Sequence, residues 1–325
     1  MEYKKLGRSG LRVSEICLGT MQFGWTADPT TSLEVLTAAY EAGINFLDTA
    51  DVYSRWAEGN PGGVAEEILG TWFRGDPSRR DQVVLATKVR GTMGSGPNDQ
   101  GLSRRHILMA CEASLRRLGV EAIDLYQLHS VDPDTPIEET LRALEDLVRR
   151  GDVRYIGCSN FPAWRVMDGL WTSQRNGWDS FLTLQPHYNL IHRAEYEREL
   201  EGVAEEFGLG VLPYSPLAGG FLTGKYRPGS TPPPGSRGAR SGRVQGYLGS
   251  DFGRHVLEKV EQIAKKRGVS PSQVSLAWLL ARPSVISPII GPKNLEQLKD
   301  NLASIQVRLT LEEIGELNEV SAYPE

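Results

Sequence analysis

Short apolar runs alternate with longer amphipathic stretches along almost the whole chain, and this alternation constrains the fold more than any other feature. The apolar runs have the length of buried strands: Ile16–Thr20, Ile44–Asp48, Val83–Lys88, Ile123–His129, Val153–Ser159, Phe181–Gln185, Gly210–Ser215 and Val285–Gly291. The stretches that follow them have helical periodicity: Thr31–Ala42, Gly63–Phe73, Ser103–Leu118, Pro136–Arg149, Pro162–Asn176, Glu195–Phe207, Asp251–Arg267 and Asn294–Ser304. Eight strands and eight helices in alternation predict an α/β fold, a (β/α)8 TIM-type barrel with a parallel sheet.

Two segments lie outside this repeat. Within residues 1–15, the stretch Tyr3–Val13 alternates around Arg8-Ser9-Gly10, which predicts an N-terminal β-hairpin that caps the N-terminal end of the barrel. Leu311–Val320 follows Thr310 and predicts an extra C-terminal helix. Parallel barrels reach 325 residues as one unit, so we expect a single domain over residues 1–325.

One connection is unusually long. Residues 218–250, which follow the seventh predicted strand, are rich in Gly, Pro, Ser and Arg and contain Thr231-Pro232-Pro233-Pro234-Gly235. Compact domains seldom carry so long a structureless loop without a use, and barrel enzymes keep their sites on this face. We interpret it as a flap over a ligand; a tolerated surface insertion is the alternative.

Polar residues stand at or just beyond the ends of three neighbouring predicted strands. Asp48 ends the second strand, Tyr53 follows five residues later, Lys88 ends the third strand and His129 ends the fourth. A barrel gathers such positions around one mouth. Reduction of a carbonyl leaves an alkoxide that needs a proton, and a tyrosine beside a lysine ammonium can supply it. We therefore expect Asp48, Tyr53, Lys88 and His129 to form a catalytic set, with Lys88 lowering the pKa of Tyr53.

Other interpretations of these residues stay open. The Asp48–Lys88 pair could be a structural salt bridge, and Tyr53 could be ordinary amphipathic packing. Lys88 could also form a Schiff base in a barrel isomerase or lyase.

Composition excludes several classes of function. The net charge of −5 gives no electrostatic basis for general nucleic-acid binding. The N-terminus lacks the apolar core of a signal peptide, and no apolar run has membrane-spanning length. Cys17, Cys111 and Cys158 are few and odd in number, as in reduced cytoplasmic proteins, and no histidines have metal-ligand spacing. We expect a cytoplasmic protein without a metal, for which a homo-oligomer is compatible with the sequence.

Taken together, the ordered motifs resemble the aldo-keto reductase family, and most closely its bacterial branch related to potassium-channel β subunits. The resemblance rests on Gly43-Ile44-Asn45-Phe46-Leu47-Asp48-Thr49-Ala50-Asp51-Val52-Tyr53 with Lys88 and His129, and on Gly157-Cys158-Ser159-Asn160-Phe161, Leu184-Gln185-Pro186, Tyr214-Ser215-Pro216-Leu217 and Ile290-Gly291-Pro292-Lys293. It implies NADPH-dependent reduction of an aldehyde or ketone to an alcohol, with Tyr53 as acid, Lys88 and Asp48 tuning it, and His129 polarising the substrate. A non-catalytic regulatory subunit that senses pyridine nucleotide is the alternative.

The resemblance also implies how NADPH is held, because the Rossmann fingerprint is absent from the first strand–helix turn, Gly19-Thr20-Met21-Gln22-Phe23-Gly24. Ser159, Asn160 and Gln185 match residues that bind the carboxamide, and Tyr214 matches the ring that stacks on the nicotinamide. Lys293 and Arg237 would meet the 2′-phosphate. The full set of cofactor positions is Gly19, Thr20, Met21, Asp48, Ser159, Asn160, Gln185, Tyr214, Ser215, Leu217, Gly219, Lys225, Arg237, Gly291, Lys293, Gln297 and Asn301. Phe23, Trp25 and Trp56 are the candidates for the wall of a pocket for a small carbonyl substrate.

Overall fold

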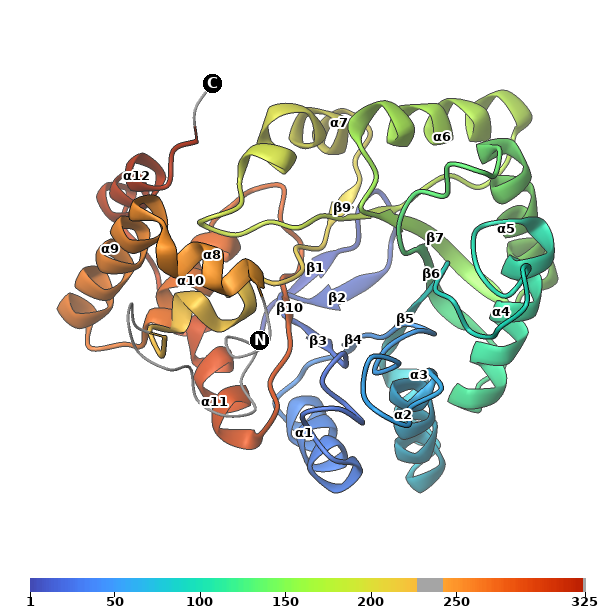
Figure 1. The fold of residues 1–325 in the computed structure, drawn as a ribbon, viewed down its shortest axis with the longest axis horizontal. Coiled ribbons are helices and arrows are strands. Elements are labelled where there is room, and N and C mark those ends of the chain that lie inside the picture. The colour runs from blue at the N-terminus through green and yellow to red at the C-terminus, as the bar shows by residue number, and fades with distance from the viewer. Residues whose placement is uncertain (227–241, 324–325) are drawn as a thin grey trace.

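Eight parallel strands form the centre of the molecule, surrounded by helices (Figure 1). The structure is a computed structural model that describes residues 1–226 and 242–323. Neighbours pair in the order β10-β3-β4-β5-β6-β7-β8-β9. Beyond this ladder, the amide of Ile286 donates to the carbonyl of Val211 at 3.0 Å and that of Ile289 to Pro213 at 2.9 Å. These bonds join the two edges of the sheet, so the predicted (β/α)8 barrel is confirmed.

The strands are short, and their bounds fall within or close to the predicted runs. They are β3 (Cys17–Gly19), β4 (Phe46–Asp48), β5 (Val84–Val89), β6 (Ile123–Leu128), β7 (Val153–Ser159), β8 (Thr183–Gln185), β9 (Gly210–Val211) and β10 (Ile289–Ile290). Alternate residues separate into two apolar clusters: Phe46 and Val84 pack in a small inner one, whereas Leu47 and Leu85 pack in a large outer one. Both faces of the sheet are therefore buried, which explains why the runs are continuously apolar.

The N-terminal hairpin fills the end of the barrel where the strands begin. β1 (Tyr3–Lys5) and β2 (Arg12–Ser14) pair antiparallel, and Leu6 and Val13 belong to the inner cluster. Gly7, at φ +53°, lies so close that a Cβ atom would come within 2.6 Å of the Leu182 carbonyl oxygen. The hairpin therefore closes the bottom of the barrel and leaves the opposite mouth for a site.

The helices form the outer ring visible in Figure 1. They are α1 (Pro29–Glu41), α2 (Val64–Gly75), α3 (Ser78–Gln82), α4 (Arg104–Leu118), α5 (Ile137–Arg150), α6 (Ala163–Asn176), α7 (Glu201–Glu206) after a π-turn at Tyr196–Leu200, α8 (Gly242–Gly249), α9 (Asp251–Arg267), α10 (Pro271–Leu280), α11 (Leu295–Ala303) and α12 (Leu311–Val320). Each predicted helix is present. Ser103 caps α4 through the amide of His106, and Thr310 with Glu313 forms a capping box on α12.

Helix α10 was absent from the predicted set, because its inward and outward positions are both apolar and give no amphipathic pattern. Prolines also shortened two strands: Pro213 follows β9 and Pro288 precedes β10, and proline has no amide hydrogen to donate to a ladder. Val285, predicted as the start of the last strand, makes one isolated bridge to Val211 instead. Among the described residues, no helix combines the length and apolar character needed to cross a bilayer.

The loop over residues 218–250 is less structureless than predicted at its two ends. Ala218–Thr223 forms two short 3₁₀ turns separated by a kink at Gly219 and Gly220, whose φ values are 68° and 90°. Gly242–Gly249 forms α8. The segment between them, including Arg237, lies outside the described residues.

Candidate active site

A cavity of about 870 Å³ opens at the mouth of the barrel. Its wall includes the last residues of several strands: Gly19, Asp48, Ser159, Gln185 and Ile290. Tyr53 and His129, which follow β4 and β6, also reach it. The barrel therefore brings three of the four predicted catalytic side chains to one cavity, while Lys88 lies fully buried behind them.

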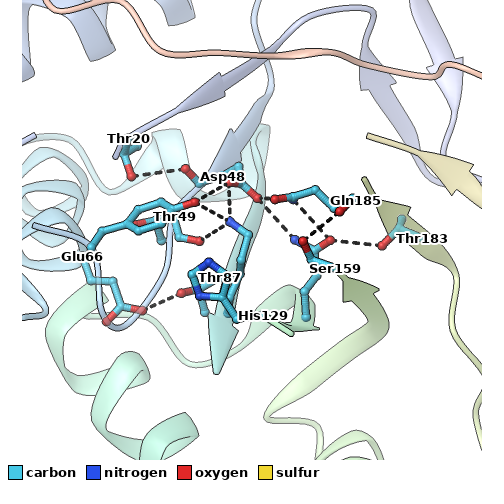
Figure 2. A network of polar contacts seen from close by, with 12 residues as sticks. Thr20, Asp48, Thr49, Glu66, Thr87, His129, Ser159, Thr183 and Gln185 are labelled. Carbon is cyan, nitrogen blue, oxygen red and sulfur yellow. Dashed lines mark hydrogen bonds and ion pairs between the residues drawn. The ribbon is translucent and has the colours of Figure 1, made fainter. Parts of the chain in front are cut away.

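Lys88 is the hub of the buried network that Figure 2 shows around Asp48. Its ammonium donates to Asp48 Oδ1 at 2.5 Å, to the Thr49 carbonyl at 2.9 Å and to the Tyr53 hydroxyl oxygen at 2.9 Å. Burial alone would lower the pKa of Lys88, but the Asp48 carboxylate and the Tyr53 hydroxyl outweigh burial and raise it. The amine is thus charged, and all three of its hydrogens are engaged.

Asp48 is held by amides on its other oxygen. Oδ2 accepts a hydrogen bond from Gln185 Nε2 at 2.9 Å and from Gln127 Nε2 at 3.3 Å, and Gln185 and Ser159 lie together on one side of Asp48 in Figure 2. Sequence reasoning missed Gln127. Its signal was a polar residue in an otherwise buried strand, a position where an unpaired amide would be costly.

Tyr53 keeps its proton. Tyr53 is 8% exposed, its oxygen accepts the hydrogen bond from Lys88, and its hydroxyl donates a long hydrogen bond of 3.5 Å to Asp48 Oδ1. Burial raises the pKa of Tyr53 to about 12, although Lys88 acts in the opposite direction. The expectation that Lys88 brings this pKa down toward neutral pH is therefore wrong for this site, because the cost of burying a phenolate exceeds the attraction of the ammonium. Tyr53 is a proton donor across the neutral range.

His129 is half-buried and neutral. Its ring lies edge-on to that of Tyr53, with centroids 5.8 Å apart. Burial, reinforced by the nearby charges of Lys88 and Arg90, lowers the pKa of His129 to about 3. One ring nitrogen of a neutral imidazole carries a hydrogen, so His129 can donate a hydrogen bond to a ligand oxygen without carrying a charge.

These two pKa values predict a flat pH profile. The pKa of His129 is about 3 and that of Tyr53 is about 12. Neither group should change protonation between pH 5 and pH 9, because this range lies roughly two pH units or more from both pKa values. If these two groups act as predicted, kcat at saturating ligands should therefore be constant over this range. Initial rates in overlapping buffers measure it. A fall in kcat on the alkaline side, centred near pH 7 and abolished in Tyr53→Phe, would show that Tyr53 titrates much lower.

Predicted site residues beyond Asp48, Tyr53, Lys88 and His129 also meet at this mouth. Ser159 donates to the Gln185 carbonyl at 2.8 Å, and Asn160, at φ 54°, donates from Nδ2 to the His129 carbonyl at 2.8 Å. The Tyr214 hydroxyl donates to Asn160 Oδ1 at 2.7 Å. These bonds tie the ends of β6, β7, β8 and β9 to one another, so the polar groups hold fixed positions.

Most predicted cofactor positions line the cavity. They are Gly19, Met21, Asp48, Ser159, Asn160, Gln185, Tyr214, Ser215, Leu217, Gly219, Lys225, Gly291, Lys293, Gln297 and Asn301. Thr20 does not: it is buried and its hydroxyl donates to the Asp48 carbonyl at 3.2 Å. Arg237 is outside the described residues. Sequence reasoning missed further polar groups of the wall, among them Ser270, Ser272, Glu296, Asp300 and Arg243.

Of the three residues predicted to line a substrate pocket, only Trp56 lies in the wall of the cavity. Trp56 lines the cavity, is 48% exposed and lies edge-on to Tyr53. Trp25 packs against Trp56, with centroids 5.7 Å apart, and is not part of the wall. Phe23 is fully buried in the outer apolar cluster, which corrects its assignment to the pocket. A tight turn leads into this buried residue, and in it the amide of Phe23 donates to the Thr20 carbonyl at 2.9 Å.

Comparison with known proteins gives consistent matches. The model of the aldo/keto reductase family matches residues 15–322. The uncharacterised oxidoreductase YrpG of Bacillus subtilis is 40% identical, over 100% of this chain and 97% of the relative. The versiconal hemiacetal acetate reductase of Aspergillus parasiticus is 38% identical, over 98% and 96%. A "Probable voltage-gated potassium channel subunit beta" of Oryza sativa subsp. japonica is 37% identical, over 94% and 92%.

Proposed function

The chain belongs to the aldo/keto reductase family, and from this premise we propose that it reduces an aldehyde or ketone to an alcohol by hydride transfer from NADPH, with Tyr53 as general acid. The observation that carries the proposal is the direction of the hydrogen bond between Lys88 and Tyr53. Lys88 donates to the Tyr53 oxygen at 2.9 Å, and the Tyr53 hydroxyl itself donates only a long hydrogen bond of 3.5 Å to Asp48 Oδ1, which a closer acceptor in the cavity can replace. A carbonyl oxygen is the acceptor that this donor suits.

Each residue of the site has a separate role in the proposed reaction. When bound, NADPH supplies the hydride. Tyr53 gives its proton to the oxygen of the substrate, and the ammonium of Lys88 stabilises the phenolate that is left. Asp48 keeps Lys88 charged, and neutral His129 donates a second hydrogen bond that orients the carbonyl. Trp56 borders the same space and favours an apolar or aromatic substituent on the substrate.

The wall of the cavity fits a nicotinamide dinucleotide. At one part, the amides of Asn160 and Gln185 suit a carboxamide, and the ring of Tyr214 offers a flat surface. Elsewhere, Lys225 and Lys293 suit phosphates. Gly219 and Gly220, both at positive φ, allow the backbone there to turn close to a ligand.

The potassium-channel relatives support a second candidate, a regulatory subunit that binds pyridine nucleotide without turnover. The two candidates differ in one result. A screen that follows cofactor oxidation with aldehydes, ketones and sugars should find NADPH consumption with at least one class. Tight binding of NADPH with no consumption across the panel would favour the regulatory subunit. A Schiff-base mechanism on Lys88 is disfavoured, because its amine is charged and fully hydrogen-bonded.

We expect NADPH to bind at least about tenfold more tightly than NADH, since a 2′-phosphate near Arg237 and Lys293 gains charge-assisted hydrogen bonds worth about 1.5–3 kcal/mol each before desolvation. Replacing both cations with Ala should remove most of the difference, and Kd values from cofactor fluorescence measure it. Lys299→Ala is a suitable control, because this exposed lysine of α11 does not line the cavity. Equal Kd values for the two cofactors in the unmutated protein would contradict the placement of the phosphate.

We also expect the loop over residues 218–250 to govern release of the cofactor. Both of its described ends reach the cavity, through Lys225 and Arg243. Shortening Gly229–Gly242 to a brief Gly-Ser linker should speed NADP⁺ release and weaken NADPH binding, while single-turnover hydride transfer changes much less. Stopped-flow fluorescence separates these steps. Unchanged release and binding would mean that the loop is a passive insertion.

A further inference from the structure

Three aromatic rings form a stacked column beside the cavity. Tyr214, beyond β9, lies almost parallel to His187, beyond β8, with centroids 5.1 Å apart and an interplanar angle of 12°. His187 in turn stacks on His192, at 3.9 Å and 26°. Tyr214 lines the cavity, whereas neither histidine does. Because His187 covers one face of Tyr214, only the opposite face and the edges of that ring remain for a ligand.

The middle ring is fixed in its orientation. His187 is 5% exposed, and its Nε2 lies 3.3 Å from Asn189 Nδ2. An amide nitrogen only donates, so Nε2 accepts and the hydrogen of His187 is on Nδ1. The same amide donates to the Ser215 carbonyl at 3.0 Å, next to Tyr214. Burial lowers the pKa of His187 to about 3, which keeps the ring neutral.

Tyr214 is fixed in position at its ends as well. Its amide donates to the Pro186 carbonyl at 3.0 Å, and its hydroxyl donates to Asn160 Oδ1 at 2.7 Å. Two hydrogen bonds set where the ring lies, but they leave rotation about the long axis of the side chain. The parallel contact with His187 restrains that rotation, because tilting Tyr214 would break the stack.

We infer that His187 is a positioning residue, which backs Tyr214 so that the column of His192, His187 and Tyr214 presents a fixed plane to the nicotinamide ring. The inference rests on the proposed function, since it assumes that a nicotinamide occupies this part of the cavity. A fixed plane covers one face of the bound ring and sets its tilt, so that the opposite face stays turned toward the carbonyl. His187 touches no ligand itself and acts through Tyr214.

Two substitutions separate the ring of His187 from its hydrogen bond. His187→Phe keeps a ring but removes the acceptor for Asn189, and His187→Gln keeps an acceptor but removes the ring. Titration calorimetry would give Kd for NADPH and for 2′-phospho-ADP-ribose, a fragment that lacks the nicotinamide. We expect the His187→Gln variant to bind NADPH with a Kd about three- to tenfold higher, because one aromatic contact has roughly this value. The Kd for the fragment should be unchanged. Phe should bind both ligands within about twofold of the unmutated protein.

A second measurement tests which face of the nicotinamide ring gives the hydride. With NADPH deuterated on one face of the nicotinamide, the Gln variant should lose part of the facial selectivity that the Phe variant retains. Unchanged NADPH binding and selectivity in the Gln variant would overturn the inference, and so would equal weakening of NADPH and the fragment. If His187→Phe lost NADPH affinity and facial selectivity while His187→Gln kept both, the inference would also be overturned, because the effect would then come from the hydrogen bond to Asn189. An unmutated protein that binds no NADPH would instead overturn the proposed function itself.

Discussion

Tyr53→Phe should lower kcat for carbonyl reduction by about a hundred- to ten-thousand-fold, the usual contribution of general acid catalysis. The change removes one oxygen, whose partners are Lys88 at 2.9 Å and, weakly, Asp48 at 3.5 Å. The ring still fills its buried place between Trp56 and His129. Folding and NADPH binding should therefore survive. Steady-state rates at saturating substrate, with Kd for NADPH from fluorescence, measure the two effects separately.

A matched variant makes this result specific. Tyr40→Phe also removes one hydroxyl, whose partner is Gln82 at the surface, and it should leave kcat unchanged, because neither residue lines the cavity. If Tyr53→Phe kept more than roughly a tenth of the activity while binding NADPH normally, Tyr53 would not be the acid.

Lys88→Met should combine a catalytic loss with the largest loss of stability in the site. It leaves the Asp48 carboxylate, 1% exposed, without a counter-charge. Removing one partner of a buried ion pair costs about 3–5 kcal/mol of unfolding free energy, here eased by the two amides that still donate to Asp48. Denaturant unfolding measures it. Lys259→Met breaks a partly exposed pair with Glu316 and should cost no more than about 1 kcal/mol.

The stabilisation by Lys88 has a defined pH range. Its folded pKa is raised above its ordinary value, so the contribution is fully present below the unfolded pKa and is lost as pH rises through the folded value. The difference in stability between the unmutated protein and Lys88→Met should therefore be constant through neutral pH and shrink only in strong alkali. A difference below about 1 kcal/mol at neutral pH would show that the pair is not a buried, coupled one.

The repeating pattern was enough to predict the barrel, because strands buried on both faces must be apolar and the helices that cover them must be amphipathic. The same reasoning missed α10, because its buried residues lie on all sides and the helix is not amphipathic. It also overextended β9 and β10, since an apolar run does not show that Pro213 and Pro288 interrupt the ladder.

The candidate site was predictable where a polar residue marks a strand end, as at Asp48, the last residue of β4, and Lys88, which lies one residue before the end of β5. It was not predictable where a role depends on a neighbour that is distant in sequence. Gln127 acts through Asp48, and His187 acts through Tyr214. A polar residue in a buried strand signals that Gln127 needs a partner, but nothing local in the sequence identifies Asp48 or Tyr214 as the partners. The pKa of Tyr53 was predicted in the wrong direction, because the depth of burial, which outweighs Lys88, is set by the whole fold.

Transfer of deuterium from NADPH, with both hydrogens at the nicotinamide C4 replaced by deuterium, to the carbonyl carbon of a substrate tests the central claim most directly. With the best aldehyde or ketone from the screen, the product alcohol should carry one deuterium at that carbon, and the Tyr53→Phe variant should form it at a rate lower by about two orders of magnitude or more. Mass spectrometry of the product measures both. An alcohol without deuterium, or a protein that binds NADPH and never consumes it, would contradict the assignment as a carbonyl reductase.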